Sequence, residues 1–281
     1  MKVVKELKGG SLSKTVIIND GQRFLVRKYI SSIENREYGL VRWQSQVRRL
    51  QMLRSYLGEN VITIESMGVD GNFFYYDMPF YENAVNCSEL LENSDSNVDL
   101  ASEISQLLFR MSQVSFGMVS GSVSVYLSDE VLHPLRNSLD QLLLIQGDIF
   151  SNIKGMKQEI ESAIDLVLML IKKYENKKIT ESLTHGNLTL ENILWDKDSQ
   201  KLILIDPYSE TYTESPCGDI SQIAQSSLSG YEYIIKNELY NDPSIQDYPY
   251  TSIPKKTKSF GNEILNLVSQ FDWFDNDLYH I

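Results

Sequence analysis

Residues 183–207 decide the fold, and they read Leu-Thr-His-Gly-Asn-Leu-Thr-Leu-Glu-Asn-Ile-Leu-Trp-Asp-Lys-Asp-Ser-Gln-Lys-Leu-Ile-Leu-Ile-Asp-Pro. Two short apolar runs, 193–195 and 202–205, flank a polar turn that contains two aspartates and a serine. Short apolar runs on either side of such a turn are typical of a β-hairpin. We therefore expect a hairpin whose open ends both carry polar residues.

The polar residues at those ends suggest a site for a hard cation. His185, Asn187 and Asn192 precede the first strand, and Asp206 follows the second. Strand pairing would bring Asn192 opposite Asp206, so that an amide oxygen and a carboxylate could share one ion. Oxygen ligands of this kind suit Mg²⁺ and its phosphate partners.

This stretch resembles the catalytic and metal-binding loops of the aminoglycoside and choline kinase-like phosphotransferases, small-molecule relatives of the protein kinases. Their pattern is His-Gly-Asp, four residues, Asn, and then a strand ending in Ile-Asp-Pro. His185-Gly186, Asn192 and Ile205-Asp206-Pro207 match it, whereas Asn187 stands where the family has its catalytic Asp. The resemblance implies an α+β, two-lobed protein-kinase-like fold, with a β-rich N-lobe over 1–83 and a mainly helical C-lobe over 84–281.

The start of the chain carries a glycine-rich segment, Gly9, Gly10 and Ser11, ahead of two strand patterns. These strands, 15–18 and 23–29, flank an Asn-Asp-Gly turn, which is a strong hairpin signal. Glycines let backbone N–H groups approach phosphates closely, although such a segment is also a common turn. The resemblance identifies it with the kinase phosphate loop.

In that resemblance the second strand carries the lysine that contacts phosphate. Lys28 is the residue we assign, with Arg27 as the alternative, and either could instead be a solvated strand charge. A helix follows over 37–57, with its apolar stripe in the core and its arginines predicted to form a solvated face. Gln46 takes the position of the kinase glutamate that pairs with the lysine, where it could hydrogen-bond Lys28 without neutralising it.

Two further strands are expected at 61–67 and 72–78, and they lead into the segment that the resemblance identifies as the hinge between the lobes. Met78 and Phe80 lie there, and adenine would be recognised mainly by backbone groups. After residue 86 the pattern changes from strands to helices, which marks the lobe boundary. The helices expected from the sequence cover 98–114, about 128–151, 157–174 and about 259–271.

Asp219 matches the family aspartate that braces the catalytic loop, and Gln222 stands where the family has a lysine. Asp219 could equally be a helix N-cap, a position that aspartate fills well. The sequence around it is also similar to phosphotransferase-like proteins of bacterial surface-polysaccharide gene clusters. For His185 we expect a structural role in which its ring satisfies backbone carbonyls.

The amino-acid composition limits which partners this protein could bind and where in the cell it is expected. The 281 residues include 26 Lys and Arg and 38 Asp and Glu, for a net charge of −12. This charge disfavours nucleic acid and anionic membranes as partners. Two cysteines are too few for a disulfide framework, and no apolar stretch is long enough for a signal peptide or a membrane span. We expect a cytoplasmic protein without membrane insertion.

The resemblance implies a kinase that uses Mg²⁺ and ATP or GTP to phosphorylate a hydroxyl of a sugar, amino alcohol or glycan precursor. Asn187 can accept a hydrogen bond from that hydroxyl but cannot take its proton. Three interpretations remain open. The first is that the catalytic Asp was deliberately replaced by Asn. The second is a nucleotide-binding pseudokinase with a regulatory or scaffolding role. The third is a natural enzyme that works with Asn, either with another base or by transferring a different part of the nucleotide.

Overall fold

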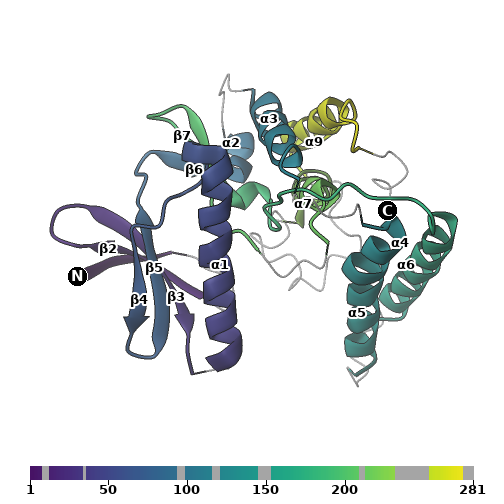
Figure 1. Cartoon of the computed structure of the whole chain (residues 1–281), viewed down its shortest axis with the longest axis horizontal. Helices are drawn as coiled ribbons and strands as arrows, with labels where there is room; N and C mark the ends of the chain where they lie inside the picture. The colour runs from purple at the N-terminus through teal and green to yellow at the C-terminus, as the bar shows by residue number, and fades with distance from the viewer. Residues whose placement is uncertain are drawn as a thin grey trace.

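The computed structural model describes residues 1–7, 13–33, 36–93, 99–115, 121–144, 153–208, 213–231 and 253–274. Its N-terminal part is a five-stranded antiparallel sheet in the order β1-β2-β3-β5-β4 (Figure 1). The strands are β1 Lys2–Leu7, β2 Ser13–Asn19, β3 Phe24–Ser31, β4 Ser66–Asp70 and β5 Phe73–Pro79. The β-rich N-terminal part expected from the sequence is thus confirmed.

The β2–β3 hairpin forms where the Asn-Asp-Gly turn predicts it. The side-chain oxygen of Asn19 accepts the N–H of Gly21 at 2.7 Å, and Asp20 accepts the N–H groups of Gln22 and Arg23, each at 2.9 Å. Gly21 has a φ of 101°, which a glycine adopts without a steric penalty. Local side-chain hydrogen bonds therefore fix the turn and with it the register of β3.

The first of the two strands predicted over 61–67 and 72–78 begins later than its sequence pattern indicates. The structure starts β4 at Ser66, whereas Val61 forms an isolated parallel bridge with Leu204. Ile62 donates its N–H to the carbonyl of Leu204 at 3.0 Å, and both Val61 and Ile62 are buried. Val61 and Ile62 thus pack into the C-terminal half of the chain, and the prediction of a strand over 61–67 was wrong for residues 61–65.

Helix α1, Arg36–Leu57, lies along one face of this sheet and packs against β3 and β5 (Figure 1). The ring of Trp43 stacks on Phe74 with centroids 5.6 Å apart, and its indole N–H donates to the carbonyl of Tyr75 at 3.1 Å. The helix ends in a single turn of 3₁₀ helix over Gly58–Asn60. Helix α1 is thus anchored to the sheet that carries Lys28.

The expectation that the arginines of α1 form a solvated face was only partly right. Arg48 is exposed, but Arg49 is buried and forms an ion pair with Glu214. Helical periodicity gave no sign of this exception because the acidic partner lies far along the chain.

The second sheet contains β6 Ala84–Asn86, β7 Ile193–Asp196 and β8 Lys201–Leu204, all antiparallel. The hairpin predicted within 183–207 is confirmed, with Trp195 paired with Leu202. The first sheet ends at Pro79 and the second begins at Ala84, so residues 80–83 link the two. The lobe boundary at 83/84 stays a prediction.

The C-terminal part is mainly helical, as expected. Its helices are α2 Cys87–Asn93, α3 Leu100–Ser112, α4 Val123–Tyr126, a π-helical turn Leu127–Leu132, α5 His133–Leu144, α6 Ile153–Lys173, α7 Pro216–Leu228 and α9 Lys255–Val268. Helices α3, α7 and α9 pack together, and α4, α5 and α6 form a separate group (Figure 1). The element expected over 128–151 is split into the π-helical turn and α5, and its residues 145–151 lie outside the described part. No helix among the described residues is long and apolar enough to cross a membrane.

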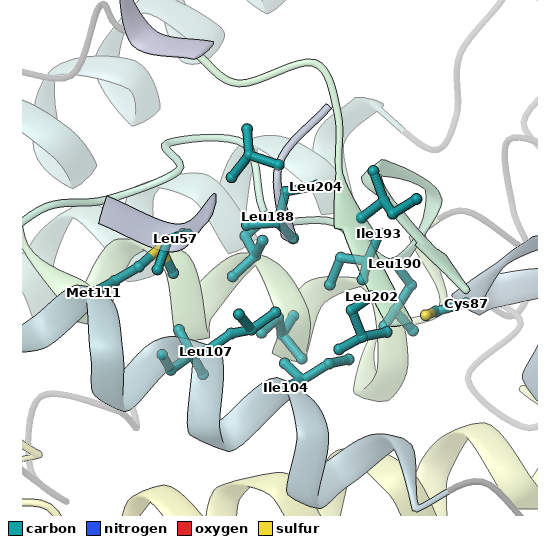
Figure 2. Packing of buried hydrophobic residues seen from close by; sticks show 14 of the residues in the cluster. Leu57, Cys87, Ile104, Leu107, Met111, Leu188, Leu190, Ile193, Leu202 and Leu204 are labelled. Carbon is teal, nitrogen blue, oxygen red and sulfur yellow. The ribbon is translucent and has the colours of Figure 1, made fainter. Parts of the chain in front are cut away.

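One apolar core joins the two halves beneath the candidate site. Figure 2 shows side chains from the end of α1, from α3 and from the second sheet packed against one another. Leu188 and Leu190, which lie inside the predicted catalytic loop, are each at most 1 % exposed. Burying one such leucine contributes about 1.5–3 kcal/mol. The polar residues of this loop are therefore held by apolar neighbours on either side.

Candidate active site

Gly186 makes the bend of the loop, at a position where any other residue would be strained. Gly186 has a φ of 75°, and a Cβ there would lie 2.2 Å from the carbonyl oxygen of Tyr208. The N–H of Tyr208 donates to the carbonyl of His185 at 3.1 Å. This close approach holds the chain after β8 against the loop before β7.

Asp219 braces the same bend from α7. Its carboxylate accepts the backbone N–H of His185 at 2.7 Å and that of Gly186 at 2.8 Å. Burial raises the pKa of this carboxyl to about 7, against the effect of the two N–H donors. The N-cap of α7 is Ser215, which accepts the N–H of Cys217, so the alternative that Asp219 is the cap was wrong.

Gln222, one turn further along α7, contacts the loop as well. Its side-chain oxygen accepts the N–H of Leu188, and its amide nitrogen donates to the carbonyl of Gly186 at 2.9 Å. A lysine at this position could make only the second bond, since it has no acceptor. The neutral replacement therefore belongs to the hydrogen-bond network of the loop.

The ring of His185 is fully buried, and neither of its nitrogens has a hydrogen-bond partner among the described residues. Burial lowers the pKa of this histidine to about 4. The charge of Asp206 opposes this shift, and so does the nearby backbone of Ile205 and Asn187. The expectation that the ring satisfies backbone carbonyls stays a prediction, since the backbone of Ile205 and Asn187 lies near the ring. The backbone of His185 is held by Asp219.

The two asparagines lie beside Asp206 and are linked to it through the backbone. Asn187 donates its amide N–H to the backbone carbonyl of Asp206 at 3.1 Å, and Asn192 donates to the carbonyl of Asn187 at 2.9 Å. Asn192 pairs through its backbone carbonyl with the N–H of Ile205 at 3.0 Å, one residue before Asp206. These bonds orient both amide groups, and neither side-chain oxygen accepts a hydrogen bond from the described residues.

Asp206 has a left-handed backbone, with a φ of 53°. Residues other than glycine adopt this region uncommonly, and such residues are concentrated at functional sites. Its side chain is 36 % exposed, so a ligand can reach it beside the buried Lys28 and Gln46.

Lys28 reaches Asp206 from the first sheet. It is 4 % exposed, and its ammonium group forms an ion pair with Oδ1 of Asp206. Arg27, the alternative, is also buried and is bound by both oxygens of Asp77 on β5, at 2.7 and 2.9 Å. The burial of both residues contradicts the alternative that either is a solvated strand charge, and of the two it is Lys28 that reaches Asp206.

Gln46 on α1 also contacts Asp206. Its amide nitrogen donates to Oδ1 of Asp206 at 2.9 Å, and its oxygen accepts from the hydroxyl of Tyr76 at 3.4 Å. The expected hydrogen bond to Lys28 is replaced by this one, because the ammonium of Lys28 is itself directed to Asp206. Tyr76 was missed by the sequence analysis, which gave no signal for it beyond an apolar strand pattern.

A second missed contact ties α1 to the predicted catalytic loop. Arg49 donates to Glu214 at 2.9 Å and to the backbone carbonyl of Thr184 at 3.3 Å, and the hydroxyl of Thr184 donates to Glu214. The buried arginine thus joins the helix that carries Gln46 to the residue that precedes His185.

Two of the remaining predicted nucleotide contacts, Met78 and Phe80, lie at or near the link between the sheets. Met78 is buried in β5, and the ring of Phe80 meets that of Phe24 edge-on with centroids 6.4 Å apart. Gly9, Gly10 and Ser11 lie outside the described residues.

The side-chain oxygens at this site fit a Mg²⁺ ion that is shared between the protein and the phosphates of a nucleotide. In the described part of the chain no three His, Cys, Asp or Glu side chains gather as a metal cage. Mg²⁺ commonly uses one or two side-chain oxygens and completes its shell with water and phosphate oxygens. Oδ2 of Asp206 and the side-chain oxygen of Asn192 provide such a pair, since neither accepts a hydrogen bond from the described residues.

Comparison with known proteins identifies the fold. No family model matches the sequence, and no curated protein matches it. Among solved structures, a glucosamine kinase in complex with glucosamine, ADP and phosphate matches with a TM-score of 0.55 and 12 % identity, over 98 % of this chain and 67 % of its own. A Haemophilus somnus protein described as a fructosamine-3-kinase matches with a TM-score of 0.53 and 15 % identity, over 94 % and 90 %.

An aminoglycoside phosphotransferase from Streptomyces rimosus matches with a TM-score of 0.51 and 12 % identity, over 94 % of this chain and 92 % of its own. At such identities the likeness concerns the fold. The two-lobed protein-kinase-like fold, of the kind found in aminoglycoside phosphotransferases, is therefore confirmed. The narrower kinship with proteins of polysaccharide gene clusters stays a prediction.

Proposed function

We propose that this chain binds ATP or GTP with Mg²⁺ and transfers the terminal phosphoryl group to a hydroxyl of a sugar, amino alcohol or glycan precursor. The observation that carries this proposal is the meeting of Lys28, from the first sheet, with Asp206, beside Asn187 and Asn192. The solved structures that share the fold include a glucosamine kinase with bound ADP and an ethanolamine kinase from Plasmodium vivax, which is consistent with a small hydroxyl-bearing acceptor.

Each residue has a role that its surroundings support. Lys28 would bind phosphate oxygens, and Asp206 and Asn192 would hold Mg²⁺, which when bound supplies positive charge to the phosphates. The acceptor oxygen forms a bond to the terminal phosphorus while the bond to the leaving diphosphate oxygen breaks. Phosphoryl transfer of this kind needs mainly positioning and charge neutralisation. The oxygen of Asn187 would accept a hydrogen bond from the acceptor hydroxyl, and the proton leaves to solvent.

A second candidate function is nucleotide binding without efficient transfer, in a regulatory or scaffolding protein. It is supported by Gln46, Asn187 and Gln222, three neutral residues at positions where the family pattern has charged ones. Each of them donates or accepts hydrogen bonds within one network around the loop. General-base catalysis contributes about 10²–10⁴-fold, so its loss would leave binding intact and turnover slow.

Thermal unfolding with nucleotide tests the shared part of both candidates. ATP, GTP or ADP with millimolar Mg²⁺ should raise the melting temperature, because a ligand at a hundredfold excess over its Kd stabilises the native state by about 2.7 kcal/mol. Asp206→Ala should abolish the Mg²⁺-dependent part of this rise. Asp140→Ala, at an exposed position on α5, is the matched control and should leave it unchanged. No rise with any purine nucleotide would overturn the proposal.

A further inference from the structure

We infer that Tyr76 and Gln46 are positioning residues that hold the Asp206 carboxylate with one oxygen kept for the metal. The inference rests on the proposed function, since it concerns the metal that accompanies the nucleotide. It gives a role to two buried residues that the sequence pattern leaves unexplained: a neutral residue at the position of the kinase glutamate, and a tyrosine within an apolar strand.

The three side chains form a chain of hydrogen bonds that runs from the buried interior to the site. Tyr76, in the middle of β5, is 0 % exposed, and its hydroxyl lies 3.4 Å from Oε1 of Gln46. Gln46 is 3 % exposed, and its amide nitrogen lies 2.9 Å from Oδ1 of Asp206. The side chain of Asp206 is 36 % exposed. Only the last member of this chain is therefore open to a ligand.

The two neighbours of Gln46 select one orientation of its amide. A carboxylate only accepts hydrogen bonds, so the NH₂ group must be turned toward Asp206. The oxygen then lies toward Tyr76, whose hydroxyl donates to it. Burial, and after it the charge of Asp206, raises the pKa of Tyr76 well above its ordinary value, which keeps the hydroxyl protonated. Tyr76 thus fixes Gln46, and Gln46 in turn fixes Asp206.

The arrangement also distributes the two oxygens of Asp206. Lys28 and Gln46 both donate to Oδ1, so Oδ2 has no hydrogen-bond partner within the described ranges. A glutamate at position 46 could not donate to Asp206 and would place a second negative charge beside it. Glutamine instead supplies a neutral donor that holds the carboxylate without competing for the metal. This is the behaviour expected of a residue that supports a metal ligand from behind.

The test uses the full chain and measures how much Mg²⁺ is needed, at fixed saturating ADP, for half of the metal-dependent rise in melting temperature. Gln46→Leu removes the donor to Asp206, and we expect the half-saturating Mg²⁺ concentration to increase by about 10–100-fold. Tyr76→Phe removes only the hydroxyl, and we expect a smaller increase of the same sign. In the double variant the effect of Tyr76→Phe should vanish, because it acts through Gln46.

Matched controls separate positioning from packing. Tyr75→Phe removes a hydroxyl from the adjacent residue of β5, which alternates to the other face of the sheet, and Gln44→Leu makes the same replacement at an exposed position of α1. Neither should change the half-saturating Mg²⁺ concentration. A purely structural role would lower the melting temperature of Tyr76→Phe and Gln46→Leu without Mg²⁺ and leave that concentration unchanged, which would overturn the inference.

The outcome for the unaltered chain keeps this inference apart from the proposed function. If ADP and Mg²⁺ stabilise the unaltered chain and both variants respond to Mg²⁺ as it does, the positioning role alone is wrong. If the unaltered chain shows no Mg²⁺-dependent stabilisation with any purine nucleotide, both the proposed function and the positioning role are wrong.

Discussion

Arg49 and Glu214, 165 residues apart in the chain, form an ion pair that joins helix α1 to the segment before α7. The side chain of Arg49 is 6 % exposed and that of Glu214 is 24 % exposed. Removing one partner of a buried pair leaves an uncompensated charge and typically costs about 3–5 kcal/mol. We expect Arg49→Met to reduce the free energy of unfolding by about 3 kcal/mol, near the lower end of this range, because solvent reaches Glu214.

Urea unfolding of Arg49→Met, Glu214→Leu and the double variant measures this cost. If the ion pair is what stabilises the fold here, the double variant should lose clearly less free energy of unfolding than the sum of the two single variants. Strictly additive losses would mean that each side chain acts through other neighbours.

Restoring a carboxylate at position 187 separates the enzyme from the pseudokinase. Asn187→Asp supplies a proton acceptor beside Lys28 and Asp206, and turnover of a working site should rise by roughly two to four orders of magnitude. Nucleotide affinity should change little, because the base acts in the transition state. The variant also loses the 3.1 Å bond from the amide of Asn187 to the carbonyl of Asp206, at a cost of about 1 kcal/mol in stability.

Release of nucleoside diphosphate, measured with a panel of sugars and amino alcohols, is the assay for this change. Asn137→Asp adds the same charge at an exposed position of α5 and should have no effect. If the unaltered chain is active and Asn187→Asp does not raise its turnover, asparagine is the native catalytic group.

Acid should destabilise the fold partly through His185. Its pKa is lowered from 6.5 to about 4 in the folded chain, so the unfolded chain binds a proton that the folded chain excludes between these values. The free energy of unfolding should therefore fall as the pH drops from about 6.5 to 4, by about 3 kcal/mol for a difference of this size. Above about pH 6.5 this contribution should be constant.

The comparison that isolates this effect is with His185→Phe, unfolded in urea at several pH values. Asp219 has the opposite trend, because its raised pKa makes the folded chain lose stability as the pH rises toward 7. The unaltered chain and His185→Phe both keep Asp219, so the difference between their curves of unfolding free energy against pH measures the contribution of His185. Parallel curves from pH 4 to 7 would contradict the assignment.

Gly186→Ala should be strongly destabilising. The left-handed φ of 75° costs an alanine about 1–2 kcal/mol, and its Cβ would also lie 2.2 Å from the carbonyl oxygen of Tyr208. We expect a loss of at least about 2 kcal/mol in unfolding free energy. The matched control is Gly58→Ala, where φ is 59° and nothing lies within 4 Å of the new Cβ. Equal losses at the two positions would show that the approach of Tyr208 is unimportant.

Much of the site follows from features that are local in sequence. The hairpin around residues 193–204 forms because its turn and its apolar runs are adjacent, and strand pairing then places Asn192 next to the residue before Asp206. Lys28 follows from the register of β3, which the Asn-Asp-Gly turn fixes. Such elements can be predicted because the interactions that define them are between residues close in the chain.

Contacts between distant elements were decided by the tertiary structure alone. The run from Val61 reads as a strand, but the backbone of Val61 and Ile62 pairs with Leu204 in the second sheet instead of with β5. Arg49 reads as a surface charge, and it is buried because folding brings Glu214 to it. The link from Tyr76 through Gln46 to Asp206 depends on how α1 lies across β5. Periodicity records which face of an element is apolar, whereas these pairs depend on which elements meet, and that is settled only when the whole core packs.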